Sequence, residues 1–178
     1  MRQPGRASAE LAAPIDPREF RDTVGAFVTG VTVVTTVVDG EPYGMTVSAF
    51  ASVSLEPLLV LVCLGAGSRG RALVARSQVF SVNVLAGDQA HLSRLFASRD
   101  RPGGLDGFDG VPFSWGATGC PVLRGAAAHV DCRVADSSET GDHTIMIGEV
   151  VGIGSAPDAA PLLFHRGRYR LLKGSERV

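Results

Sequence analysis

The chain has 178 residues, of which 45% are hydrophobic and 20% charged, and its formal net charge is −1. This length predicts one folded domain with its own core. The composition excludes a disordered protein, and the lack of basic excess excludes the surface typical of a nucleic-acid-binding or membrane-surface protein.

The N-terminal 15 residues contain scattered Arg, Ala and Pro but no apolar segment typical of a signal peptide. The longest apolar run, residues 58–64, is too short to cross a bilayer. We therefore expect a protein without membrane contact, with a disordered tail at residues 1–15 and a single domain at residues 16–178.

Cysteine and histidine spacing argues against metal and disulfide chemistry. The three cysteines, Cys63, Cys120 and Cys132, are far apart and have apolar neighbours, which favours neither a disulfide framework nor a Cys-based metal site. The four histidines show no metal-ligand spacing. A reducing cytoplasm fits this pattern, and we expect no metal.

The first predicted element is a helix that begins at Asp16-Pro17, where Asp is a good N-cap and Pro a good first residue. Apolar residues at helical spacing continue this pattern, and Gly30 is expected to end it. The following Val/Thr run, residues 31–38, reads as a strand, and Asp39-Gly40 is a hairpin signal.

Short strands dominate the rest of the chain. Further strands are expected at residues 44–57, 58–64, 79–85, 126–135, 143–153 and 162–172, helices at 68–77 and at 88–99 with Asp88 as its cap, and a long surface loop at 100–119. In 126–135 the alternation places His129, Asp131 and Arg133 on a solvent-facing side. About seven strands joined mostly by turns predict a mainly β fold with peripheral short helices, as a closed or partly closed barrel.

Four short hydroxyl side chains mark the strand predicted at 44–57. Thr46, Ser48, Ser52 and Ser54 have one parity, so in a continuous strand they share a face that carries no Lys or Glu between Thr46 and Ser54. Such a row is common on the wet side of a half-buried strand. It also suits a flat ligand that needs hydrogen-bond donors, and both interpretations stay open on the residues alone.

The segment Gly65-Ala66-Gly67-Ser68-Arg69-Gly70 matches G-x-G-x-x-G between a strand and a helix. One interpretation is a dinucleotide fingerprint, with Asp88 about 20 residues further on. The other is a flexible turn in which Ser68, Arg69 and the helix N-terminus receive a phosphate. We favour the second, because the flanking chain is strand after strand.

Among the histidines, His143 is the candidate for chemistry. It lies between a Gly-Asp turn and a buried strand, so its side chain is expected at a barrel rim in a ligand-binding or proton-handling position. No nucleophile elbow or papain-like setting surrounds the Ser and Cys residues, which argues against a hydrolase.

Taken together, five blocks in order carry a family resemblance. They are Thr29 to Thr36; Gly44 to Thr46 with Ser52 to Pro57; Phe80 to Leu85; Gly141 to Thr144 with Ile147 to Val150; and Pro161 to Phe164 with Gly167 and Tyr169. From about Phe20 to Leu172 the chain resembles the short-chain flavin reductases, small NAD(P)H:flavin oxidoreductases that supply reduced flavin to two-component monooxygenases.

This resemblance implies a flavin-binding split β-barrel, usually a homodimer with flavin near the subunit interface. The positions that match the family's flavin contacts are Thr46, Val47, Ser48, Ala49, Phe50, Ser52, Val53, Gly67, Ser68, Arg69, Arg99 and Asp100. Those that match its nicotinamide side are His143, Phe164, His165, Arg166 and Gly167, with His143 as the residue expected to assist the reaction. Ser48-Ala49 departs from the family, which often has Asn followed by Ser or Ala.

The function expected from this resemblance is hydride transfer from NADH, or NADPH, to FMN or FAD, which then diffuses to a partner oxygenase. The flavin and nicotinamide carry out this chemistry, so the protein has to position them and exclude water. Two alternatives are a flavin-binding redox sensor or storage protein that holds FMN without turnover, and a Rossmann-type nucleotide binder.

Overall fold

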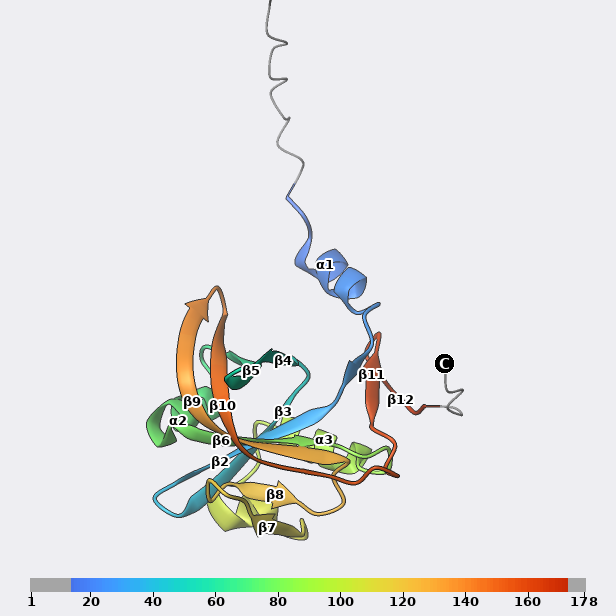
Figure 1. The fold of residues 1–178 in the computed structure, drawn as a ribbon. Helices are drawn as coiled ribbons and strands as arrows, with labels where there is room; N and C mark the ends of the chain where they lie inside the picture. The colour runs from blue at the N-terminus through green and yellow to red at the C-terminus, as the bar shows by residue number, and fades with distance from the viewer. Residues whose placement is uncertain (1–13, 173–178) are drawn as a thin grey trace, which may run out of the picture.

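The computed structural model describes residues 14–172. Its main element is a seven-stranded sheet in the order β3-β2-β6-β9-β10-β5-β4, with every neighbouring pair antiparallel (Figure 1). The strands are β2 (Thr32–Val38), β3 (Glu41–Val47), β4 (Phe50–Leu55), β5 (Leu58–Gly65), β6 (Val79–Val84), β9 (Ala128–Thr140) and β10 (His143–Ser155). This pattern overturns the Rossmann-type alternative, which requires parallel strands.

Strands β3 and β4 follow one another in the chain yet form the two edges of the sheet. Only Ser48 and Ala49 connect them, and a connection of this length spans at most about 11 Å. The sheet therefore curls until its two edges approach each other at Ser48 and Ala49, which makes it a split β-barrel. The expected fold class is confirmed.

The same connection shows that the strand predicted at residues 44–57 is wrong as a single element. The chain leaves β3 at Val47 and enters β4 at Phe50, and the pairing of β4 with β5 shifts register between Ser52 and Ser54. A register shift changes which face a side chain lies on. The four hydroxyls therefore do not form one continuous face.

A three-stranded sheet, β1-β11-β12, lies beside the barrel. It consists of β1 (Thr29–Gly30), β11 (Leu163–His165) and β12 (Arg168–Arg170). The single strand predicted at 162–172 is wrong, because the chain turns at Arg166 and Gly167, whose φ angles are 46° and 74°. Two successive positive φ values are typical of a tight hairpin turn. The Asp39-Gly40 turn, with φ angles of 54° and 82°, is of the same kind and was predicted correctly.

Helix α1 (Pro17–Val24) begins as predicted, with the Asp16 carboxylate accepting a 2.8 Å hydrogen bond from the Arg18 amide. It ends at Gly25, five residues before the predicted stop at Gly30. No residue of α1 is buried, and the helix lies apart from the barrel, beyond β11 (Figure 1).

Helices α2 (Arg69–Ser77) and α3 (Ala90–Ala97) lie close to their predicted ranges. The capping role predicted for Asp88 is wrong. Gln89 holds the N-cap position of α3, and its side-chain oxygen accepts a 3.0 Å hydrogen bond from the Ala86 amide.

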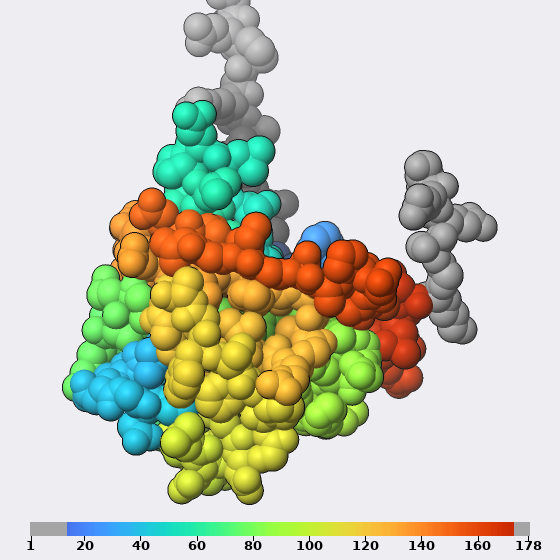
Figure 2. Space-filling model, turned by 60° about the horizontal axis from the view of Figure 1, so that its bottom comes forward, coloured from blue at the N-terminus to red at the C-terminus, as the bar shows by residue number. Residues whose placement is uncertain are grey.

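The segment predicted as a loop at 100–119 contains a 3₁₀ helix, η1 (Gly104–Phe108), and strand β7 (Phe113–Trp115), which pairs with β8 (Pro121–Leu123). Phe108 and Val111 are buried in a hydrophobic cluster with Phe96 and Leu123. The prediction of a surface loop is therefore wrong. Figure 2 shows this yellow segment spread over one face of the molecule.

The segment that contains β7 and β8 also explains why one prediction in β9 was wrong. Asp131, expected on a solvent-facing side, is only 1% exposed. Its carboxylate accepts a 2.9 Å hydrogen bond from the Ala117 amide and a 3.4 Å bond from the Thr118 hydroxyl, both in the β7–β8 turn. A buried carboxylate is tolerated where such donors reach it.

Two hydrophobic clusters stabilise the fold. One fills the barrel and contains Val34, Val62, Phe80 and Met146, and the other lies between the sheet, α3 and β11. In residues 14–172 no helix is long and apolar enough to span a bilayer. The tail predicted at residues 1–15 lies, apart from its last two residues, outside the described part of the chain.

Candidate functional site

A cavity of about 930 Å³ opens where the barrel edges approach each other. Four segments line it: the end of β3 with Ser48 and Ala49, the turn from β5 into α2, the chain that follows α3, and the β9–β10 turn. Its size is within the range usual for small-molecule sites.

At one end of the cavity lies the glycine-containing turn, residues 65–70. Ser68 is the N-cap of α2, and its hydroxyl accepts a 3.1 Å hydrogen bond from the Arg71 amide. The amides of Arg69 and Gly70 are in the first helical turn, so they have no acceptor within the helix. Unsatisfied amides at a helix N-terminus attract anions.

Gly70 is required here by a close approach. A Cβ atom at this position would overlap the Met45 sulfur atom and lie 3.2 Å from the Tyr43 ring. The glycine therefore lets α2 pack directly against β3, which brings the helix N-terminus to the cavity.

Arginine side chains gather beside this helix start. Arg69, Arg99 and Arg101 all line the cavity. The guanidinium carbons of Arg69 and Arg101 lie 5.3 Å and 5.2 Å from the centre of the Tyr43 ring, at cation–π distance. The two ion pairs found in residues 14–172, Arg76–Asp39 and His143–Asp142, involve none of these three arginines.

One of the hydroxyls predicted to contact the flavin has another partner. The Thr46 hydroxyl donates a 2.7 Å hydrogen bond to the carbonyl oxygen of Ser93 in α3. Thr46 and Val47 still line the cavity, but Val47 is buried at 8% exposure. Ser48 and Ala49 are exposed, and they present the connection between β3 and β4 to the cavity.

His143 also lines the cavity, at the start of β10 as predicted, where it pairs with Gly65 of the glycine-containing turn. Its side chain is 50% exposed, and its Nδ1 atom lies 2.7 Å from a carboxylate oxygen of Asp142. The hydrogen bond from His143 and the charge of its ring lower the pKa of the Asp142 carboxyl below its ordinary value. Asp142 thus holds one ring nitrogen of His143 and leaves the other free for a ligand.

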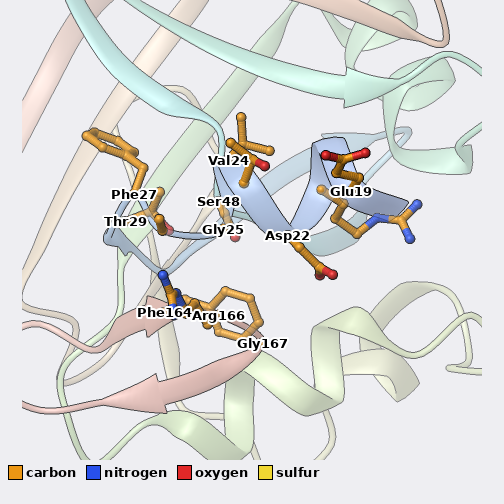
Figure 3. A pocket seen from close by; sticks show the side chains of 13 residues that line it. Glu19, Asp22, Val24, Gly25, Phe27, Thr29, Ser48, Phe164, Arg166 and Gly167 are labelled. Carbon is orange, nitrogen blue, oxygen red and sulfur yellow. The ribbon is translucent and has the colours of Figure 1, made fainter. Parts of the chain in front are cut away.

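A second cavity, of about 1310 Å³, lies between α1 and the β11–β12 turn (Figure 3). Phe164, Arg166 and Gly167 line it, and the Arg166 amide donates a 3.0 Å hydrogen bond to the Gly25 carbonyl at the end of α1. Ser48 lines both cavities, so they adjoin at the connection between β3 and β4.

Most of the predicted site residues therefore come together around these two cavities. The exceptions are Phe50, Ser52, Val53, Asp100 and His165, which line neither. Phe50 packs against the barrel core, and Ser52 and Val53 lie further along β4. The predicted roles of these five residues gain no support from the geometry.

The residues of the first cavity that sequence reasoning missed include Tyr43, Met45, Cys63 and Arg101. The alternation of β3 could have pointed to Tyr43 and Met45, which precede Val47 on the same face. No signal in the sequence indicated that Arg101 belongs to the cavity, apart from its position two residues after Arg99. Within the described residues, no group of three or more His, Cys, Asp and Glu side chains is placed to hold a metal.

Comparison with known proteins identifies the family of this chain. Residues 24–173 match the family described as "Flavin reductase like domain". The chain is 43% identical over 161 residues to the reductase subunit HsaB of a flavin-dependent monooxygenase from Rhodococcus jostii, covering 90% of this chain and 80% of that protein. It is also 43% identical over 163 residues to an NADH-dependent FAD reductase from Streptomyces globisporus, covering 91% and 89%.

Solved structures give the same result at the level of the fold. The NADH:FAD oxidoreductase SgcE6 from Streptomyces globisporus superposes with a TM-score of 0.85 at 41% identity, covering 94% of this chain and all of that one. The family match spans most of the chain, and the relatives are matched over most of their own length. The chain belongs to the family of proteins with a flavin reductase like domain.

Proposed function

We propose that this protein is a flavin reductase that uses NADH, or less readily NADPH, to reduce FMN or FAD for a partner oxygenase. Family membership supports the flavin, and relatives named as NADH-dependent FAD or FMN reductases support the hydride donor. The observation that carries the proposal is the pair of adjoining cavities that share Ser48, because hydride transfer needs two ligands in contact.

The residues of the first cavity fit a phosphate-bearing flavin. The N-terminus of α2 with Arg69 and Arg99 would bind the phosphate, and these arginines form none of the ion pairs in residues 14–172. The exposed connection at Ser48 and Ala49 would meet the ring system, with the Ser48 hydroxyl as one donor. When both ligands are bound, the flavin accepts a hydride from the reduced nicotinamide, so no side-chain base is required.

For the nicotinamide, we propose the region where the two cavities adjoin. Phe164, Arg166 and Gly167 would contact it from the second cavity, and His143 would position it from the first. The hydrogen bond with Asp142 orients the His143 ring, which is what a positioning group requires.

A homodimer is part of the proposal, because α1 needs a partner. Phe20, Val24, Phe27 and Val28 are 59%, 51%, 77% and 47% exposed, and an eight-residue helix is not stable in water without packing. A second copy of the chain is the proposed cover for this apolar surface. Light scattering on the purified protein tests it, and a monomeric mass would contradict it.

Three free cysteines in the described residues are consistent with a cytoplasmic location.

The reductase proposal is tested by mixing the purified protein with NADH and excess free FMN and following the nicotinamide absorbance. Many turnovers per protein molecule are expected. A single bleaching of bound yellow colour would favour the flavin-binding sensor or storage protein instead. Repeating the assay with FAD and with NADPH identifies the preferred pair of substrates.

A further inference from the structure

We propose that Arg101, which no sequence motif singled out, is a specificity-determining residue that binds the flavin phosphate together with Arg69. This inference rests on the proposed function, since it concerns the flavin substrate of the same cavity. The Arg101 side chain is held by contacts from two separate elements, β3 and α3.

The Arg101 side chain is held firmly in place. Its Nη1 atom donates a 3.2 Å hydrogen bond to the Leu95 carbonyl in α3, and its Nη2 atom donates to the Gly44 carbonyl in β3. The guanidinium also stacks on the rings of Tyr43 and Phe96, at 5.2 Å and 4.8 Å from their centres. A cation fixed in this way loses little further freedom when it binds an anion.

The Arg101 guanidinium has hydrogen-bonding capacity that its contacts with the protein do not use. It has five N–H groups, and the hydrogen bonds found in residues 14–172 use two of them, both to neutral carbonyl oxygens. No carboxylate in this part of the chain pairs with Arg101. At the wall of the cavity the guanidinium therefore has N–H groups that no carbonyl oxygen uses, together with its positive charge.

A second positive charge, that of Arg69, neighbours Arg101. Arg69 stacks on the same Tyr43 ring, so both arginines lie beside one aromatic side chain of the cavity. Burial is the main cause that lowers the pKa of Arg101 below its ordinary value, interactions with Tyr43 oppose it, and the charge of Arg69 adds a smaller lowering contribution. Two cations that repel one another in this way bind a phosphate or diphosphate group well, since it relieves the repulsion.

A purely structural role would also account for the two carbonyl bonds, because arginine often satisfies the last carbonyls of a helix. The experiment has to separate the two roles. FMN and riboflavin share the ring system and differ in the phosphate, so their affinities for one variant report the phosphate contact directly.

The test measures dissociation constants for FMN, FAD and riboflavin by quenching of flavin fluorescence, with wild type, Arg101→Met and Arg101→Lys. We expect Arg101→Met to weaken FMN and FAD binding by about 10- to 100-fold, the value of a charge-assisted hydrogen bond, and to leave riboflavin binding little changed. Arg101→Lys should recover part of the loss, since it keeps the charge but not the fork of donors. Arg76→Met, at an exposed arginine of α2 that pairs with Asp39, is the matched control and should change no affinity.

Equal losses for FMN and riboflavin, or unchanged FMN affinity, would overturn the inference. If Arg101→Met does not fold, as judged by circular dichroism, Arg101→Lys decides by the same comparison, and FMN affinity must also fall more steeply with salt than riboflavin affinity in the wild type. The reductase proposal is judged separately, by turnover of the wild-type protein with NADH and FMN.

Discussion

The hydroxyl group of Thr46 donates a 2.7 Å hydrogen bond to the carbonyl oxygen of Ser93, which ties β3 to α3 behind the first cavity. The Ser93 hydroxyl accepts a 2.9 Å bond from the Tyr169 hydroxyl in β12. Three elements that lie far apart in the sequence thus meet at Ser93. Thr46 acts through this network and not as a free donor to a ligand.

Replacing Thr46 with Val is therefore expected to cost stability. The substitution keeps the shape of the side chain but removes the donor to Ser93, which should lower the free energy of unfolding by about 1 kcal/mol. Denaturant unfolding measures this change. Thr46→Ser, which keeps the hydroxyl, is the control, and a Val variant as stable as the wild type would contradict the assignment.

The role proposed for His143 predicts a separation of two kinetic effects. His143→Ala should lower turnover with NADH by about 10- to 100-fold, because a poorly positioned nicotinamide reacts slowly, while flavin affinity changes much less. Asp142→Asn, which weakens the contact that orients the ring, should have a smaller effect in the same direction. Equal losses of turnover and flavin affinity in His143→Ala would refute a positioning role.

Gly67 offers a test of flavin placement that does not disturb the fold. A Cβ atom at Gly67 would meet nothing within 4 Å, so Gly67→Ala should leave the melting temperature unchanged. If the flavin packs against this turn, the added methyl group would obstruct it and weaken binding by about tenfold. Gly30→Ala, also in open space but outside both cavities, is the control. Unchanged flavin affinity in Gly67→Ala would place the flavin elsewhere.

Gly44, unlike Gly67, is closely surrounded by other side chains. A Cβ atom there would lie 2.8 Å from two atoms of the Phe96 ring and 3.4 Å from the Phe108 ring. Both rings are held in the cluster beneath α3 and η1, so neither can move freely. We expect Gly44→Ala to destabilise the protein by about 1 to 3 kcal/mol in denaturant unfolding. A loss no larger than that of Gly30→Ala would show that the rings can yield.

Local signals in the sequence predicted local structure well. The Asp39-Gly40 hairpin depends on two residues that tolerate positive φ, and the start of α1 depends on a capping side chain two residues away. Such features need no knowledge of the rest of the fold. The strand count predicted a barrel, and the family resemblance specified a split barrel and pointed to twelve of the residues that line the two cavities.

The helix end expected at Gly30 and the cap expected at Asp88 were wrong on local grounds, but three other errors lie where distant segments decide the outcome. Alternation alone placed Asp131 in solvent, because the β7–β8 turn that covers it is remote in the sequence. The prediction of one hydroxyl face was wrong because the chain crosses from one sheet edge to the other at Ser48 and Ala49. The periodicity of the sequence does not show such a crossing. Arg101 escaped notice because its importance depends on contacts with β3 and α3.

The buried cysteines predict how stability depends on pH. Burial raises the pKa of the Cys120 thiol from 9.0 to about 11 and that of Cys132 to about 12, in both cases with a contribution from the charge of Asp131. Both thiols stay protonated in the folded protein at a pH where the unfolded chain has begun to lose these protons. Their contribution to stability is therefore complete below about pH 9 and is lost as the pH rises towards the folded values.

Unfolding midpoints at about pH 8 and about pH 10 measure this loss, which Cys120→Ala should reduce because it removes one of the two shifted groups. Cys63→Ala, at a partly exposed cysteine, is the control and should keep the wild-type difference.

The burial of Cys120 and Cys132 also predicts that a thiol reagent labels Cys63 first in the native protein, since the reactive thiolate is suppressed at the other two. Because Cys63 lines the first cavity, bound FMN should slow its labelling, and rapid labelling of Cys120 or Cys132 in the folded state would contradict their burial.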